Sequence, residues 1–316
     1  LASLKKRLED SGHRILLPDE KGDGVHLIAE PWMCSGAYNY QLGNFPPYFA
    51  EWNDITRDTV RAVSTRPENV NPQALRNVIE GCPSKFAGKL RSINYVACHD
   101  GYCLFDLNTY DRPNPETKGG FTGEMCSSYQ GNEEEQDNAI RKQILILMVS
   151  YGIPMVQFGD IFLHSKSGNN NSYNLDNKIN RINYKLDSRK AKLSKYIKEL
   201  IKFRKENPIF SETYYKERIE YLYPSGAGIN DFDDSYWKNN SSNILCFKVN
   251  DIKNNFYIAI SKDKNPIRLF LPNNAKNKNR YLIADTKEGF IDLKGKKYPL
   301  AFYELKPYSA CIFKEK

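Results

Sequence analysis

Val25-His26-Leu27-Ile28-Ala29, followed at once by Glu30, is the clearest indication of the fold class. It is too short for a helix and largely apolar, which predicts a strand covered on both faces. Residues 93–98 and 154–158 have the same character, and all three runs lead into a carboxylate. Because these runs alternate with helical patterns over residues 25–151, we expect repeated βα units and a parallel sheet of the α/β class.

Two helices are marked by their ends. Asn132 is a suitable cap for a helix whose first turn carries three glutamates, and Gly152 ends that helix. The apolar residues of this helix recur at helical spacing, which predicts one face turned toward the core. A second helix is expected over about residues 187–206, with its many lysines on the solvent face.

The chain changes character beyond Pro208. Short segments rich in Tyr, Ile, Phe and Val alternate with polar turns, notably at residues 244–249, 255–261 and 310–313. This pattern predicts an antiparallel β-sandwich or a small barrel. We place the boundary near Ser211, so the expected domains are residues 1–211 and residues 212–316.

Composition excludes several classes of protein. The 316 residues are 40% hydrophobic and 27% charged, which is typical of a globular protein and of neither a disordered nor a membrane-embedded one. The net charge of +8 comes from scattered lysines without an aromatic stripe, so we expect no nucleic-acid partner. No apolar run approaches the roughly 18 residues of a spanning helix, and we expect no membrane insertion.

The seven cysteines include no CxxC pair, which argues against a disulfide framework and against a zinc site. A reducing compartment fits this usage best, so a cytoplasmic protein is expected, with a plastid as the alternative. The residues after Leu1 do not resemble a signal peptide, and any targeting segment is expected upstream.

Glu30 and Asp100 are the candidate catalytic residues. In a βα barrel, the carboxyl ends of the strands converge on one rim, where the active site is built. Two carboxylates across a sugar ring suit glycoside hydrolysis, since one protonates the leaving oxygen and another attacks or stabilises the cationic transition state. His99, next to Asp100, supplies a hydrogen-bond donor for a sugar hydroxyl.

A carboxylate at a strand end is more often a surface or helix-capping residue than a catalytic one. The surrounding sequence must therefore show whether Glu30 is catalytic. The segment after Glu30 is dense in aromatic residues, which suit the flat apolar faces of sugars. These residues are Trp32, Tyr38, Tyr40, Phe45, Tyr48, Phe49 and Trp52. Any single ring could equally belong to the core.

Several motifs resemble the isoamylase and glycogen-debranching branch of the α-amylase superfamily (glycoside hydrolase family 13), over most of the chain. Residues 27–32 (LIAEPW), 43–46 (GNFP) and 50–54 (AEWND) resemble the family's acid/base strand and the loop after it. Residues 94–101 (NYVACHDG) are similar to its His-Asp block, and residues 168–173 (GNNNSY) to its triple-asparagine loop.

The resemblance implies strands five to eight of a (β/α)8 barrel, with strand six near residues 49–52, followed by the C-terminal sandwich. It implies Glu30 as general acid/base and Asp100 as the carboxylate that grips sugar hydroxyls, in a retaining hydrolysis of α-1,6 branch linkages in glycogen or amylopectin. The expected nucleophile is an Asp at the position before Leu1, so we expect this chain alone to be inactive.

The further substrate-binding residues that we expect are His99, Trp32, Phe45, Trp52, Asn171 and Tyr173. The partner is a branched α-glucan, and both homo- and hetero-oligomers are compatible with the sequence. No cofactor or metal is expected, because protonation and carboxylate attack need none.

The sequence departs from the family pattern in places. The last strand ends in Gly159-Asp160 without a following Glu, and Arg181 and Tyr184 stand where the family has tryptophans. Two alternatives therefore stay open. One is a non-catalytic, isoamylase-like glucan-binding subunit, and the other is a related hydrolase or transferase that acts on α-1,4 linkages.

Overall fold

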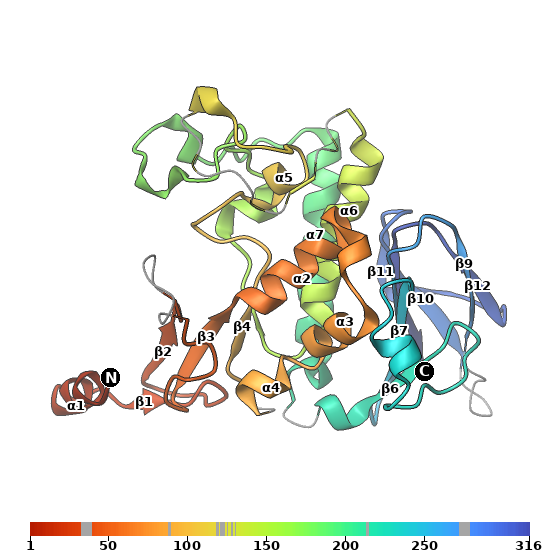
Figure 1. Cartoon of the computed structure of the whole chain (residues 1–316), viewed down its shortest axis with the longest axis horizontal. Coiled ribbons are helices and arrows are strands. Elements are labelled where there is room, and N and C mark those ends of the chain that lie inside the picture. Colours follow the sequence, from red (N-terminus) through yellow and green to blue (C-terminus); the bar gives the residue numbers. More distant parts are fainter. Residues whose placement is uncertain are drawn as a thin grey trace.

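The structure is a computed structural model. It describes residues 1–32, 40–87, 90–117, 120, 124, 126–127, 129, 131–212, 215–271 and 279–316. A parallel sheet and a pair of antiparallel sheets lie at opposite ends of the molecule, with helices between them (Figure 1).

Five parallel strands form one sheet in the order β1-β2-β3-β4-β5, so neighbours in the sheet are also consecutive in the chain. Their bounds are β1 Ile15–Leu16, β2 Val25–Ala29, β3 Phe49–Asn53, β4 Ser92–Asn94 and β5 Ile153–Pro154. The predicted parallel sheet is confirmed, and the strand expected near residues 49–52 is β3.

Two predicted strands are longer than the observed ones. The strand expected over residues 93–98 ends at Asn94, and the strand expected over residues 154–158 ends at Pro154. The Met155 amide still donates to the Asn94 carbonyl at 2.7 Å, but the chain then turns into the 3-10 helix η3, Phe158–Phe162. Val96 is nevertheless buried, so its apolar character reflects packing rather than strand pairing.

One face of β2 is open among the described residues, contrary to the expectation that both faces are covered. Its side chains alternate in burial, and Ile28 is 56% exposed. Alternation along a strand sends Ile28 and His26 to the same face, and His26 is exposed as well.

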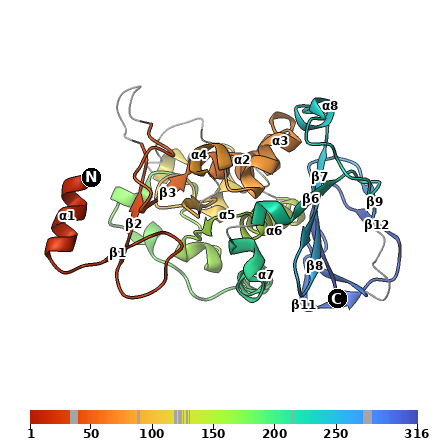
Figure 2. The ribbon, with the colours of Figure 1, turned by 90° about the horizontal axis from the view of Figure 1, so that it is seen from below.

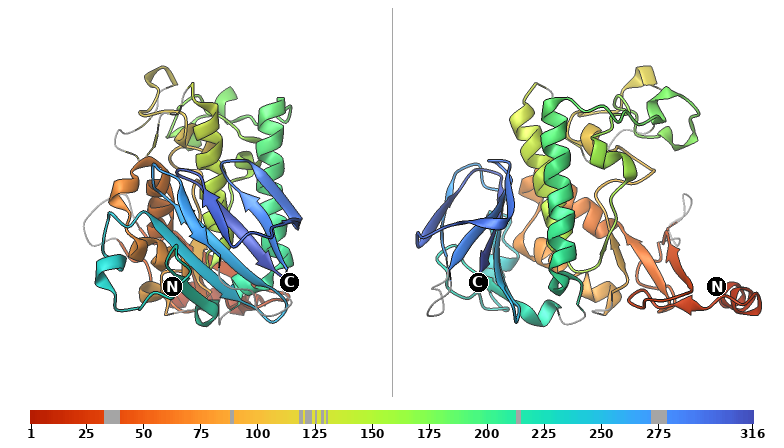
Figure 3. Two further views of the ribbon diagram at one scale, coloured as in Figure 1. Left: turned by 90° about the vertical axis from the view of Figure 1, so that its right-hand side faces the viewer. Right: turned by 180° about the vertical axis from the view of Figure 1, so that it is seen from behind.

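The helices between the sheets include α2, α3, α6 and α7 (Figures 1 and 3), and α1 lies at the end far from the antiparallel sheets (Figure 2). The bounds are α1 Ala2–Asp10, α2 Asp54–Thr65, α3 Pro72–Ile79, α4 Pro83–Phe86, α5 Leu104–Leu107, α6 Glu133–Val149, α7 Ser188–Glu206 and α8 Asp234–Trp237. Helix α7 packs against β11 and helix α3 against β7, which attaches the antiparallel sheets to the helical layer.

The two long predicted helices are confirmed, and so is the predicted Asn132 cap. Asn132 accepts the Glu135 amide at the start of α6, and Asp187 accepts the Lys190 amide at the start of α7. These side chains satisfy amides that have no partner inside the helix.

The antiparallel strands form a six-stranded sheet, β11-β10-β13-β8-β7-β6, and a two-stranded sheet, β12-β9. Their bounds are β6 Ile219–Leu222, β7 Ile244–Asn250, β8 Asn255–Ser261, β9 Ile267–Phe270, β10 Arg280–Asp285, β11 Phe290–Lys297, β12 Phe302–Leu305 and β13 Ala310–Glu315. The predicted segments correspond to β7, β8 and β13, so the antiparallel character of this region is confirmed. Within the described ranges, no helix combines the length and apolar character needed to cross a bilayer.

Candidate active site

The predicted catalytic residues emerge at the edge formed by the carboxyl ends of the parallel strands. Glu30 directly follows β2, and His99 and Asp100 lie a few residues beyond β4. Parallel strands end at a common edge, so residues far apart in sequence are delivered to one side of the sheet.

The register of the sheet also gives Glu30 and Trp52 a common face. Ile28 pairs with Ala50 across β2 and β3. Side chains alternate along each strand, so Glu30, two residues beyond Ile28, and Trp52, two residues beyond Ala50, share the face on which Ile28 is exposed.

Three of the predicted binding residues lie in a row of ring contacts. The ring centroids of Trp52 and His99 are 5.4 Å apart, and those of His99 and Tyr173 are 5.9 Å apart in an edge-on arrangement. Trp52 also contacts the buried Tyr95 at 5.7 Å, so the row is anchored in the core. Tyr173, in the 3-10 helix Ser172–Asn174, is 61% exposed and offers a free aromatic surface.

The two candidate carboxylates are both exposed. Asp100 accepts its neighbour's Gly101 amide at 3.0 Å, while Glu30 has no hydrogen-bond partner among the described residues. A carboxylate that is not held by protein donors remains free to accept or donate a proton to a bound ligand.

A buried ion pair that sequence reasoning missed supports the segment around Asp100. Arg61 of α2 bonds Glu124 at 2.7 Å and donates from Nε to the Val96 carbonyl at 2.8 Å. Glu124 also accepts the Tyr102 amide at 3.0 Å. The pair thus holds the chain on both sides of His99 and Asp100.

The asparagine loop is tied to the same ion pair. Asn170 is buried, donates to Glu124 at 3.1 Å, and accepts the Gly120 amide at 2.8 Å. Asn169 is buried too, and it donates to the Thr117 carbonyl and accepts the Asn171 amide. The asparagines therefore shape the loop that presents Tyr173, and Asn171 is half-buried beside them.

Phe45 does not lie next to the row formed by Trp52, His99 and Tyr173. Its ring contacts Phe49, the first residue of β3, at 5.4 Å, whereas Trp52 lies near the other end of that strand. The Phe45 carbonyl accepts Arg91, which also pairs with the buried Glu51.

Trp32 is half-buried and has no ring contact with the described members of the row. Tyr38, in the aromatic segment after Glu30, lies outside the described residues.

Asp160, the carboxylate that follows the last predicted strand, is buried and bonds the protein backbone. Its Oδ1 accepts the Leu104 amide at 3.0 Å, at the start of α5. Burial raises the pKa of Asp160 to about 7. This carboxyl group therefore joins the segment after β5 to the segment after β4, without reaching solvent.

No protein-family model matches the chain. Curated relatives do: an isoamylase of Flavobacterium sp. is 31% identical over 85% of this chain and 38% of its own length. A glycogen debranching enzyme of Erwinia tasmaniensis is 31% identical over 65% of this chain and 34% of its own length. The similarity to the isoamylase and glycogen-debranching enzymes is confirmed, and the chain spans little more than a third of these relatives.

Among solved structures, the pullulanase from Bacillus acidopullulyticus superposes with a TM-score of 0.68 at 20% identity. The match covers 92% of this chain and 34% of the pullulanase. At this level of identity the likeness concerns the fold.

Proposed function

We propose that the protein carrying this isoamylase-like chain hydrolyses α-1,6 branch linkages of glycogen or amylopectin with retention of configuration. Glu30 is the general acid/base and Asp100 the carboxylate that stabilises the transition state. The observation that carries this proposal is the common edge at which Glu30, Trp52, His99 and Asp100 emerge. The similarity to curated isoamylases supports the same assignment.

We further propose that β2 to β5 are strands five to eight of a (β/α)8 barrel. On this proposal, residues 1–211 belong to the barrel domain and residues 212–316 form a β-sandwich domain. The exposed Ile28 supports the barrel, because it shares a face with Glu30 and would be covered inside a closed barrel. The fold likeness to a pullulanase supports it too.

In the proposed mechanism, Glu30 protonates the leaving oxygen of the branch linkage while a second carboxylate attacks the anomeric carbon. In the family that the chain resembles, that nucleophile is an Asp. A retaining reaction requires it to lie roughly 5 Å from the Glu30 carboxyl group. Water then resolves the glycosyl intermediate, with Glu30 acting as base.

The row of rings would hold the glucan. Flat apolar sugar faces stack on aromatic rings, which suits Tyr173 and Trp52, and a ring N–H of His99 can donate to a hydroxyl. Asp100 would accept hydroxyl hydrogen bonds that strengthen as positive charge develops on the sugar. Trp32, Phe45 and Asn171 remain predicted contacts outside this row.

A non-catalytic glucan-binding subunit is the less favoured function. Such a protein needs the rings but gains nothing from an acid/base glutamate at the end of β2. The relatives' names, isoamylase and debranching enzyme, also favour a hydrolase.

The function is tested by supplying the full gene product with amylopectin and, separately, with linear maltooligosaccharides. We expect new reducing ends from amylopectin, with the released chains initially in the α-anomeric form by proton NMR. Comparable release from the linear substrate would contradict the α-1,6 assignment and favour the α-1,4 alternative. No release from either would favour the binding subunit.

A further inference from the structure

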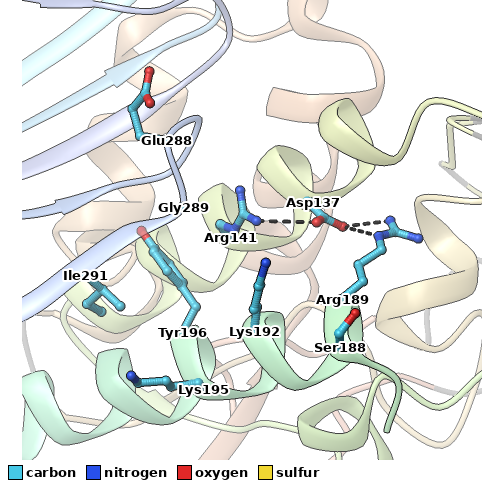
Figure 4. Close-up of a pocket in the computed structure, with 10 residues that line it drawn as sticks. All are labelled: Asp137, Arg141, Ser188, Arg189, Lys192, Lys195, Tyr196, Glu288, Gly289 and Ile291. Atoms are coloured by element: carbon cyan, nitrogen blue, oxygen red, sulfur yellow. Dashed lines mark hydrogen bonds and ion pairs between the residues drawn. The ribbon is translucent and has the colours of Figure 1, made fainter.

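A cavity of about 510 Å³ lies away from the sheet edge, between α6, α7 and the turn that joins β10 to β11 (Figure 4). Its polar lining includes Asp137 and Arg141 of α6 and Arg189, Lys192, Lys195 and Tyr196 of α7. Its volume is in the range of small-molecule sites, which span about 300–1,000 Å³.

The lining carries more positive than negative charge. Asp137 accepts Arg189 at 2.6 Å with one oxygen and Arg141 at 3.3 Å with the other, and Arg189 also pairs at 3.3 Å with Glu133, which is not part of the lining. Lys192 and Lys195 are exposed and form no ion pair with a described residue. An anion in the cavity would offset this excess charge.

The second acidic residue of the lining does not neutralise these cations. Glu288 stands on the turn between β10 and β11, and its carboxylate points away from Arg141 and Lys192 (Figure 4). Lys192, in contrast, rises from α7 toward Arg141 (Figure 4). Lys192 and Arg141 therefore approach each other, whereas Lys195 points away along α7 and Arg189 lies on the other side of Asp137 (Figure 4).

Tyr196 contributes its ring, and not its hydroxyl, to the lining. Its side chain rises from α7 beside the cavity and is only 2% exposed, and its phenolic oxygen is buried (Figure 4). The Arg141 guanidinium lies 5.7 Å from the centre of this ring, which helps to fix the arginine.

Gly289 lets the turn approach Arg141 closely. Its φ is +63°, and a Cβ built there would lie 2.9 Å from the guanidinium carbon of Arg141. Arg141 is further fixed by donating to the Thr286 carbonyl at 2.9 Å. The arginine is therefore held in place before any ligand arrives, which lowers the entropic cost of binding.

We propose that this cavity binds the phosphate group of a small phosphate ester, of which a sugar phosphate is the class that fits the volume. A phosphate monoester carries between one and two negative charges at neutral pH, and its oxygens match the planar fork of arginine. Arg141 and Lys192 would contact its oxygens, and Lys195 would add positive charge nearby. The site is separate from the proposed hydrolytic edge, so binding does not depend on the hydrolytic function.

The test is calorimetric titration of the purified protein with inorganic phosphate, glucose 6-phosphate and glucose. We expect both phosphates to bind and glucose not to bind. Tighter binding of glucose 6-phosphate would identify a sugar phosphate as the ligand, and equal binding would show that the phosphate group alone is recognised. Failure of both phosphates to bind at millimolar concentration would overturn the proposal.

Paired variants of α7 locate the site. Lys192→Gln with Lys195→Gln is expected to weaken phosphate binding about tenfold, through the lost contact of Lys192 and the lost nearby charge of Lys195. Lys198→Gln with Lys202→Gln removes the same charge from the exposed face of α7, outside the cavity lining, and should change affinity less than about twofold. Equal losses of phosphate affinity in the two double variants would show that binding depends only on the net charge of the protein. This result would contradict the proposed position of the site.

Discussion

Gly101 illustrates how tightly the backbone is packed where the proposed catalytic residues emerge. Its φ is +75°, and a Cβ at this position would lie 2.4 Å from Oε1 of Glu124. That same oxygen accepts the Tyr102 amide and Arg61. A side chain here would therefore disturb the ion pair that supports Asp100.

Gly101→Ala is expected to lower the free energy of unfolding by about 1–3 kcal/mol, from backbone strain and the clash together. Gly12→Ala is the matched control, because Gly12 has a similar φ of +79° and a Cβ at this position would meet nothing within 4 Å. Urea unfolding of both variants checks this. If Gly101→Ala lowers the free energy of unfolding no more than Gly12→Ala does, the clash with Glu124 does not contribute to the loss of stability.

Part of the candidate site could be predicted from single residues, and part could not. Glu30, His99 and Asp100 lie just beyond apolar strands, which is a local pattern. Glu124 lies in a segment without regular periodicity, and its role depends on Arg61 from a distant helix. The available signal was Arg61 itself, a charged residue on the buried face of α2 between Val60 and Val63.

At the scale of elements, α6 carries an unusual buried lysine. Lys142 is 1% exposed and donates only a long bond of 3.3 Å to the Val63 carbonyl. Burial lowers the pKa of Lys142 from its ordinary value of 10.5 to about 7. Burying this side chain in its charged form costs free energy that the helix must recover through packing.

Lys142 should make stability depend on pH. Between pH 7 and about 10 the unfolded state binds more protons at Lys142 than the folded state, so the free energy of unfolding should rise with pH over this window. Lys142→Met should remove most of that rise and be more stable at pH 7 by about 2 kcal/mol. Urea unfolding at pH 7 and pH 9.5 measures both effects. The exposed control Lys202→Met should keep the rise, and a rise that persists in Lys142→Met would mean that another group causes it.

Helices were predicted better than strands because their signals are local. The Asn132 cap predicted the start of α6, and the helix expected over about residues 187–206 corresponds to α7. The apolar runs after β4 and β5 were predicted as strands, but neither run continues as a strand: the run after β4 is buried, and the run after β5 is half-buried and ends at the exposed Phe158. Strand pairing depends on a partner that is distant in sequence, so an apolar run alone cannot show where it stops.

At the scale of the whole molecule, the helical layer packs against a sheet on each of its two sides. One side of the layer covers the parallel sheet that carries Glu30 and Asp100, and the other side receives the antiparallel sheets through α3 and α7 (Figure 3). The proposed phosphate cavity lies at this second junction. A ligand there would bridge the two parts of the chain without touching the proposed hydrolytic edge.

The central claim is that Glu30 acts as the general acid/base at the carboxyl edge of the parallel sheet. The most direct measurement is the initial rate of reducing-end release from amylopectin by the full gene product and its Glu30→Gln form. We expect kcat to fall about 10²- to 10⁴-fold for Glu30→Gln, and to stay unchanged for Glu220→Gln, an exposed glutamate of β6. A Glu30→Gln enzyme that keeps the wild-type rate would contradict the account.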